Sequence, residues 1–332
     1  MNKTLARWAQ DIWYKDPFIG VWLMPLGFLF SDVVKFRKFL YRIGLLKTQT
    51  LPVPVIVVGN ITVGGTGKTP LIIYLAKFLK DSGYKPGIIS RGYGGLADSW
   101  PQWVNLDSLA KDVGDEALLI AKQTSCPMAV GPLRVAAARL LLEKADCDVI
   151  LSDDGLQHYA LHRTIEIAVI DGERRFGNGY CLPAGPLREP IERLTSVDLI
   201  IVNGDKQEPN EYSMSLVGDI AINLLTGEQK HLVEFKIEAC HAIAGIGHPE
   251  RFFKQLALAG LNTSNKSFPD HYSFQPEDIN FSDQKPVLMT EKDAVKCKTF
   301  AGQQHWYVPV SACPESLFTE QLLNLLREKH VR

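Results

Sequence analysis

The sequence lacks several features that would place it quickly in a functional class. Its 332 residues include six cysteines, but no C-x-x-C pair and no grouping of cysteine with histidine at metal-site spacing. Such scattered cysteines argue against a disulfide scaffold or a structural zinc site and favour a reduced, cytosolic protein. A net charge of −1 gives no reason to expect nucleic-acid binding. The apolar run 18–30 has 13 residues, includes Pro25 and precedes no small-residue cleavage site. A bilayer-spanning helix needs about 20 apolar residues, so neither a span nor a signal peptide is expected.

The first 50 residues carry a charge imbalance that the whole chain conceals. They hold eight basic and three acidic side chains, a net charge of +5, so the remainder carries −6. Apolar residues between 33 and 43 recur at helical spacing among lysines and arginines, and three of the six tryptophans lie in this segment. An amphipathic, basic pair of helices with tryptophan suits a membrane interface. The alternative is a helical hairpin packed on the core, and the residues alone do not decide between the two.

Strand and helix patterns alternate through most of the chain. The predicted strands are 53–58, 86–90, 148–152, 165–170, 199–202, 233–246, 286–290 and 305–309. The predicted helices are 70–79, 115–122, 133–145, 249–259 and 316–329. The alternation before residue 205 predicts an α/β fold with a doubly wound parallel sheet. The polar, irregular stretch 205–230 predicts a connection to a second, smaller α/β unit.

The most informative motif lies between the first predicted strand and the first predicted helix. It reads Thr62, Val63, Gly64, Gly65, Thr66, Gly67, Lys68 and Thr69. Glycines let the backbone wrap closely around phosphates, whose charge the N–H groups and the helix N-terminus stabilise. We therefore predict a P-loop for ATP, in which Lys68 reaches the β- and γ-phosphates and the Thr69 hydroxyl coordinates Mg²⁺. One departure is Thr62, where the strict motif has glycine. An ordinary glycine-rich turn is the alternative.

Two adjacent carboxylates, Asp153 and Asp154, follow the predicted strand at 148–152. This is the position of a Walker B aspartate, which holds Mg²⁺ directly or through water because a hard cation prefers oxygen ligands. A strand-end residue that caps the next turn would explain one of the two. It explains both less well, since adjacent carboxylates repel unless a cation offsets them.

Transfer to a hydroxyl group also needs a residue that accepts or orients the hydroxyl proton. Asp115 and His271 are the candidates. Taken alone, Asp115 fits a helix N-cap and His271 fits a surface or core histidine. The residues alone do not identify the base.

Nine short motifs follow one another along the chain. They are GNITVGGTGKTP (59–70), SRGYGG (90–95), VGDEA (113–117), SDDGLQH (152–158), FGNG (176–179), LPAGPLREP (182–190), IGHPERFF (246–253), FPDHY (268–272) and TEKDAVK (290–296). Together they resemble the tetraacyldisaccharide 4′-kinase family over residues 1–310. That family transfers the γ-phosphate of ATP to the 4′-hydroxyl of a tetraacyldisaccharide 1-phosphate, the lipid A precursor, at the cytosolic face of the bacterial inner membrane.

The resemblance implies a role for particular residues. Asp115 and His271 would act together in catalysis, and Asp153 and Asp154 would form the Walker B pair. The residues that would contact substrate or metal are Tyr93, Arg134, Arg188 and Glu189. Residues 1–50 would be a membrane-associating helical segment, 51–205 the P-loop kinase core, and 206–332 a smaller α/β domain closing over the active site. The expected partners are ATP, Mg²⁺, the lipid A disaccharide precursor and the inner-membrane surface.

A second class of function competes with the kinase. A P-loop NTPase that acts as a switch or chaperone would hydrolyse nucleotide to exchange partners, and a guanine-specific one would carry N-K-x-D. The nearest string, residues 203–205, lacks the lysine and the spacing. A nucleotide-binding module without catalysis would have no need for the lysine, threonine and aspartates of the two nucleotide motifs.

Overall fold

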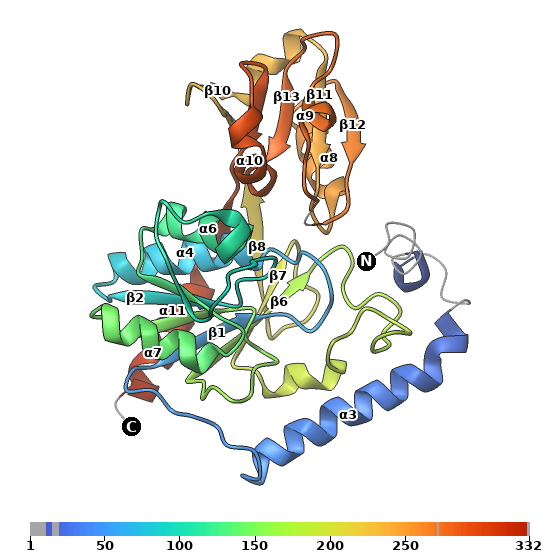
Figure 1. Ribbon diagram of the computed structural model, residues 1–332. Coiled ribbons are helices and arrows are strands. Elements are labelled where there is room, and N and C mark those ends of the chain that lie inside the picture. Colours follow the sequence, from blue (N-terminus) through green and yellow to red (C-terminus); the bar gives the residue numbers. More distant parts are fainter. Residues whose placement is uncertain (1–10, 15–19, 271, 331–332) are drawn as a thin grey trace.

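The computed structural model describes residues 11–14, 20–270 and 272–330. They form a large lobe with a smaller lobe above it, and a long helix runs along the lower edge of the large lobe (Figure 1). The predicted residue His271 lies outside the described residues, as do 1–10 and 15–19 of the N-terminal segment.

The large lobe is built on a sheet of nine strands among the described residues, in the order β15-β8-β7-β6-β1-β5-β2-β4-β3. Its strands are β1 (Val55–Gly59), β2 (Pro86–Ser90), β3 (Gln102–Val104), β4 (Met128–Val130), β5 (Val149–Asp153), β6 (Ile165–Asp171), β7 (Leu199–Asn203), β8 (Glu211–Val217) and β15 (Ser311–Pro314). All neighbours pair in parallel except the two edge strands, β3 and β15.

Helices cover both faces of this sheet. The central strands are continuous buried runs, as expected when both faces are covered. On one face lie α4 (Lys68–Asp81), α6 (Asp115–Thr124) and α11 (Ser316–His330), whose apolar side chains share a core with alternate residues of β1, β2 and β5. On the other face, α7 (Arg134–Lys144) packs against the intervening residues. The predicted doubly wound α/β fold is confirmed.

The smaller lobe has a six-stranded sheet in the order β10-β9-β14-β13-β11-β12, again among the described residues. Its strands are β9 (Ile220–Asn223), β10 (Gln229–His231), β11 (Cys240–Ala244), β12 (Thr263–Ser267), β13 (Val287–Thr290) and β14 (His305–Val308). Its helical elements are η3 (Leu232–Ile237), α8 (Pro249–Leu258), α9 (Pro276–Ile279), α10 (Glu291–Cys297) and η4 (Lys298–Phe300). Two short apolar cores flank the sheet.

The chain enters and leaves the smaller lobe through neighbouring strands of the first sheet. Strand β8 leads into the smaller lobe, and β15 returns to pair with β8. Three residues of α11, Phe318, Leu322 and Leu326, are fully buried in the core of the large lobe. The domain boundary expected at residue 205 stays a prediction. From the strand pairing we propose that the smaller domain comprises residues 220–308, inserted between β8 and β15.

Two sequence predictions miss local structure. The stretch 205–230, expected to be irregular, contains β8, β9 and β10. These strands are short or half exposed, so they lack the continuous apolar run that marks the central strands. The stretch 233–246, predicted to be extended, begins within the 3₁₀-helix η3 and becomes extended only in β11.

The N-terminal segment contains one long helix, α3 (Met24–Arg42), after the short η1 (Val21–Leu23). Pro25 occupies the first turn of α3, where its missing N–H breaks no helical hydrogen bond. Residues 11–14 are also helical. No helix in the described ranges combines the length and hydropathy that crossing a bilayer needs.

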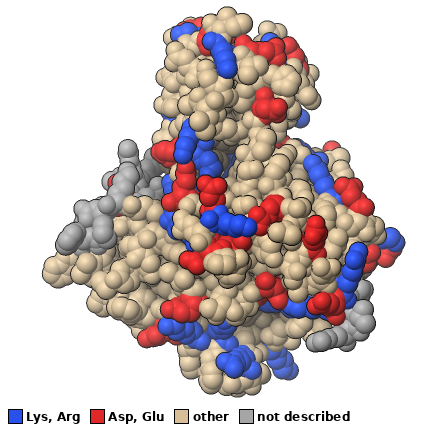
Figure 2. All heavy atoms as spheres, turned by 180° about the vertical axis from the view of Figure 1, so that it is seen from behind, with Lys and Arg blue, Asp and Glu red and all other residues tan. Residues whose placement is uncertain are grey.

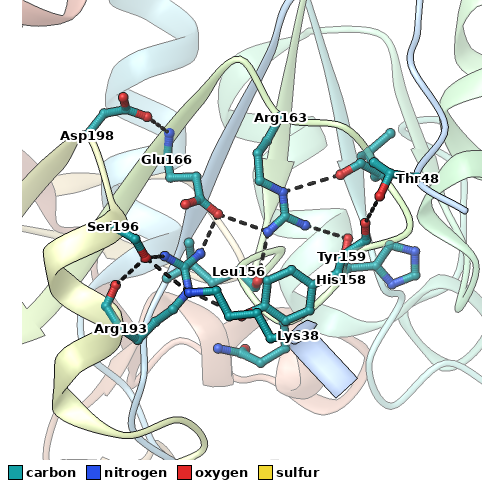
Figure 3. Close-up of polar contacts among 12 residues, drawn as sticks. Lys38, Thr48, Leu156, His158, Tyr159, Arg163, Glu166, Arg193, Ser196 and Asp198 are labelled. Atoms are coloured by element: carbon teal, nitrogen blue, oxygen red, sulfur yellow. Dashed lines mark hydrogen bonds and ion pairs between the residues drawn. The ribbon is translucent and has the colours of Figure 1, made fainter. Parts of the chain in front are cut away.

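One narrow side of α3 rests on the large lobe. It buries Gly27 and Ser31, and Gly27 lies against Ala184. Arg37 donates to the Gln157 carbonyl (3.3 Å). Lys38 extends from the helix to the Ser196 hydroxyl (3.2 Å), beside a buried network in which arginines converge on Glu166 (Figure 3). Exposed charged residues of α3 include Lys35 and Arg42, and the exposed large apolar residues of the segment 21–43 are Val21, Trp22, Leu26, Phe28, Leu29, Val33, Phe36, Phe39 and Ile43.

Candidate functional site

The predicted phosphate loop connects β1 to α4. Gly67 has φ of +98°, a conformation that favours glycine, and a Cβ there would lie 2.6 Å from the Asn203 side chain. Asn203 donates to the Thr66 carbonyl (3.1 Å), so this residue supports the loop. Thr62 lies in an antiparallel bridge with Leu187 and is not among the residues with positive φ. That extended backbone accepts a side chain, which explains why threonine can replace the glycine of the strict motif.

Lys68 starts α4 and points back across the loop. Its ammonium group donates to Asn60 Oδ1 (3.1 Å) and lies 3.6 Å from Asp154 Oδ1. Arg188 approaches the same carboxylate with two nitrogens, at 2.9 and 3.0 Å. Burial alone would raise the pKa of Asp154, but the charges of Lys68 and Arg188 lower it below its ordinary range. Asp154 is therefore ionised at neutral pH.

Asp153 ends β5 in a different setting. It is 2% exposed, and Ser90 donates to its Oδ2 (3.0 Å). Burial, together with the charges of Glu116 and Asp154, raises the pKa of Asp153 to about 6. Its Oδ1 is buried and has no hydrogen-bond partner. A buried, unpartnered carboxylate oxygen that points out of a strand end fits a cation ligand.

A cavity of about 410 Å³ opens between the two lobes in front of these residues. The large lobe contributes the whole predicted phosphate loop, Ser90, Tyr93, Glu116, Asp153, Asp154 and Arg188. The smaller lobe contributes Gly247, His248, Arg251, Asp270 and residues 290–292. A Cβ on Gly247 would lie 2.7 Å from the Gly65 nitrogen, so the backbone of the smaller lobe touches the phosphate loop itself. The cavity suits a polyphosphate ligand bound from both sides.

Asp115 is the first residue of α6, with Gly114 as the N-cap. The alternative that Asp115 is itself the N-cap is therefore wrong. Its Oδ1 accepts from the Glu116 amide (2.9 Å), and Lys296 of the smaller lobe approaches its Oδ2 at 3.5 Å. Asp115 is not among the residues that line the cavity, whereas Glu116 is. Because His271 lies outside the described residues, the pairing of Asp115 with His271 stays a prediction.

The four predicted substrate residues fall into two groups. Tyr93 is exposed and lines the cavity together with Arg188. Arg134 and Glu189 do not line it and are buried, at 3% and 1% exposed.

Arg134 lies beneath the Walker B turn. It donates weakly to the carbonyls of Asp153 and Asp154 (3.4 Å each), and burial lowers its pKa to about 10. This placement favours support of the turn over contact with a substrate.

Glu189 belongs to the buried network under α3. It accepts hydrogen bonds from Gln157 (3.0 Å) and from the Tyr159 hydroxyl, and lies 3.6 Å from Arg193. Figure 3 shows Tyr159 and Arg193 in this network, on the side of the lobe where Lys38 of α3 enters. Glu189 therefore connects the segment after Asp154 to Arg193, away from the cavity.

Sequence reasoning missed several residues of the site. Asn60, Ser90, Glu116, Asp270 and Lys292 all lie inside the nine motifs, but none has a spacing that indicates a function. Within the described residues, no three histidine, cysteine, aspartate or glutamate side chains gather closely enough to hold a metal ion.

Comparison with known proteins gives a consistent result. A family model described as tetraacyldisaccharide-1-P 4′-kinase (LpxK) matches residues 19–327. A relative from Nitrosococcus oceani, named tetraacyldisaccharide 4′-kinase, is 54% identical over 316 residues, 95% of this chain and 93% of the relative. A relative of the same name from Actinobacillus pleuropneumoniae serotype 5b is 51% identical over 312 residues, 92% of this chain and 96% of the relative.

A solved structure shares the architecture. LpxK from Aquifex aeolicus, crystallised in complex with ATP, matches with a TM-score of 0.78 and 29% sequence identity, over 93% of this chain and 99% of that chain. The family match covers both lobes and all the motifs that line the cavity. The chain therefore belongs to the tetraacyldisaccharide-1-P 4′-kinase family.

Proposed function

We propose that this protein transfers the γ-phosphate of ATP to the 4′-hydroxyl of a tetraacyldisaccharide 1-phosphate. One observation carries the proposal most strongly: the cavity joins a complete phosphate loop to a carboxylate pair at the end of β5. The family membership supplies the acceptor, and the ATP complex of the Aquifex aeolicus relative supports ATP as the donor. A switch or chaperone role has no specific support, because Asn203 contacts the loop backbone and is not placed to read a base.

The residues of the cavity fit Mg²⁺ as well as ATP. Thr69 Oγ1 and the carboxylates of Asp153 and Asp154 would hold the ion, and the unpartnered Oδ1 of Asp153 supports this assignment. When bound, Mg²⁺ would neutralise charge on the β- and γ-phosphates. Lys68 lies 3.6 Å from Asp154 Oδ1, and its ammonium group would pair with a phosphate oxygen instead of Asp154 when ATP binds. Arg188 keeps Asp154 ionised and fixes its direction.

We propose that Asp115 and His271 orient the sugar hydroxyl and accept its proton. The reason is that phosphoryl transfer requires little covalent chemistry from the protein. The positions of the sugar hydroxyl and of water therefore decide whether phosphate is transferred to the sugar or lost by hydrolysis. Asp115 belongs to the large lobe and His271 to the segment that follows β12 of the smaller lobe. A catalytic pair divided between lobes would be complete only when the lobes close, which suppresses wasteful hydrolysis.

We also propose that α3 places the protein on the cytosolic face of the bacterial inner membrane. The exposed apolar residues of α3 support this, since an acceptor with four acyl chains resides in a bilayer. Helix α3 packs on the large lobe by a narrow side, as in the packed alternative, and its exposed apolar residues support the membrane-interface alternative.

The test is transfer by the purified protein in the presence of ATP, Mg²⁺ and tetraacyldisaccharide 1-phosphate in mixed micelles. We expect a product phosphorylated at the 4′ position. Lys68→Ala should lower kcat by about 10²–10³, because charge on the transferring phosphate loses its partner. Lys80→Ala is the matched control: Lys80 caps carbonyls at Thr124 and Ser125, outside the cavity, and its loss should leave the rate unchanged. ATP hydrolysis without any phosphorylated lipid would contradict the kinase assignment.

A further inference from the structure

Helix α10 of the smaller lobe packs against α6 of the large lobe, beside the cavity. Its two lysines, four residues apart, lie on the same side of the helix. Lys292 Nζ lies 2.9 Å from Glu116 Oε1 and 3.1 Å from Asp270 Oδ1, while Lys296 approaches Asp115. Figure 2 shows acidic and basic side chains gathered where the smaller lobe meets the large one.

The two partners of Lys292 belong to different lobes, and each is next in sequence to a residue that we propose acts in catalysis. Glu116 directly follows Asp115, and Asp270 directly precedes His271. We propose that Lys292 is a positioning residue for phosphoryl transfer: its ammonium group holds together Glu116 and Asp270, which line the cavity from opposite lobes. This inference rests on the proposed function.

The electrostatics of the junction agree with this role. The side chain of Lys292 is 15% exposed, so solvent screens its ion pairs only partly. Burial alone would lower its pKa, but the carboxylates of Glu116, Asp270 and Asp115 raise it above the ordinary lysine value. Lys292 is therefore charged at any working pH. Without it, three carboxylates from two lobes would repel one another across the junction.

A second ion pair across the lobes provides a control. Lys254 of α8 lies 2.7 Å from Glu173 Oε1 of the large lobe, but the two side chains are 65% and 47% exposed. Neither residue lines the cavity. Exposed pairs of this kind contribute little because water and salt screen them. Lys292 and Lys254 thus both form an ion pair between the two lobes, but they differ in burial and in neighbouring residues.

The experiment compares Lys292→Met, which keeps an unbranched side chain one atom shorter and removes the charge, with Lys292→Arg and Lys254→Met. We expect Lys292→Met to lower kcat for lipid phosphorylation by about 10- to 100-fold, with KM for ATP changed less than about twofold. Lys292→Arg should recover most of the loss, and Lys254→Met should match the wild type. An unchanged kcat in Lys292→Met, or a loss confined to KM for ATP, would overturn the inference.

A second variant covers the case in which Lys292→Met does not fold. Asp270→Asn removes the partner in the smaller lobe and should lower kcat with the same small effect on KM. In the double variant the losses should not add, because both changes break one interaction. Additive losses would show that Lys292 does not act through Asp270. A wild-type protein that makes no phosphorylated lipid would overturn the proposed function and this inference with it, whereas an active wild type beside an equally active Lys292→Met would overturn the inference alone.

Discussion

Asp153 and Asp154 are neighbours in sequence, but their carboxylates have opposite electrostatic surroundings. Asp153 is buried beside the carboxylates of Glu116 and Asp154, and both effects raise its pKa to about 6. The charges of Lys68 and Arg188 instead keep the pKa of Asp154 low. The backbone supports the difference, because Asp154 adopts φ of +46°, an uncommon conformation outside glycine. The turn therefore directs the Asp154 carboxylate to Lys68 and Arg188 and leaves Asp153 Oδ1 without a hydrogen-bond partner.

The first prediction at this scale concerns Asp153. Asp153→Asn should raise the Mg²⁺ concentration needed for half-maximal transfer by at least about 10-fold, because an amide is a weaker ligand than a carboxylate. Titration of Mg²⁺ at saturating ATP measures this directly. Asp146→Asn changes an exposed aspartate that pairs with Lys85 on the surface, and it should leave the Mg²⁺ curve unmoved. Identical Mg²⁺ titration curves for the two variants would show that Asp153 is not a ligand of the metal.

The site residues that the sequence predicts and those that it misses differ in a physical way. Lys68, Thr69, Asp153 and Asp154 belong to local patterns, a loop between strand and helix and the end of a buried strand, which the sequence displays directly. Lys292 acquires its partner in the large lobe, Glu116, only when the two lobes meet, and Glu116 is 176 positions away. No local pattern encodes such a contact.

Among the secondary-structure elements, α3 has an unusual division of its surface. A helix of a compact domain normally turns its apolar stripe toward the core. Here small residues, Gly27 and Ser31, face the lobe, and large apolar residues such as Phe28 and Phe36 are exposed. Basic residues reach the lobe from the same helix, as Lys38 does. This arrangement leaves an apolar surface available to a lipid phase.

The second prediction therefore concerns α3. Phe36→Asp should weaken binding to vesicles that contain anionic lipid by about 10-fold or more, since burying a phenylalanine contributes roughly 1.5–3 kcal/mol. Sedimentation with vesicles measures the bound fraction, and raising the salt concentration should weaken the wild-type binding. Leu258→Asp places the same charge on a still more exposed position of α8 and should bind as the wild type does. Equal binding by both variants would contradict a lipid-facing α3.

Strands and helices were predictable where burial is continuous. The predicted strand 86–90 coincides with β2, and the predicted helix 133–145 differs from α7 by one residue at each end. The strands β8, β9 and β10 were not predicted because they lie at or near sheet edges, where their partly exposed residues give a sequence that resembles a polar loop.

At the scale of the whole molecule, a second junction joins the lobes on the side of α8. Asp171 ends β6, and its carboxylate accepts from Arg251 of the smaller lobe (2.8 Å) and lies 3.4 Å from His248 Nδ1. Arg174 donates to the Gly247 carbonyl (2.8 Å). Burial alone would raise the pKa of Asp171, but His248, Arg251 and backbone N–H groups lower it to about 2.

The third prediction follows from that pKa. Because the folded-state value lies below the unfolded value, ionised Asp171 stabilises the folded protein above about pH 4, and this contribution is lost as the pH falls toward 2. Asp171→Asn should therefore lower the free energy of unfolding by about 2 kcal/mol at pH 7 and by progressively less in acid. Urea unfolding at a series of pH values measures the difference. A difference that stays constant down to pH 2.5 would show that the charge of Asp171 is not responsible.

The insertion of the smaller lobe between β8 and β15 also sets an order on biosynthesis. A ribosome releases the phosphate loop, the Walker B turn and most of the first sheet long before it releases β15 and α11. Until then, the surfaces that Ala312, Phe318, Leu322 and Leu326 cover are exposed to solvent. The large lobe thus cannot complete its core until the smaller lobe has emerged in full, so a nascent chain holds every nucleotide-binding motif well before it holds a finished nucleotide-binding fold.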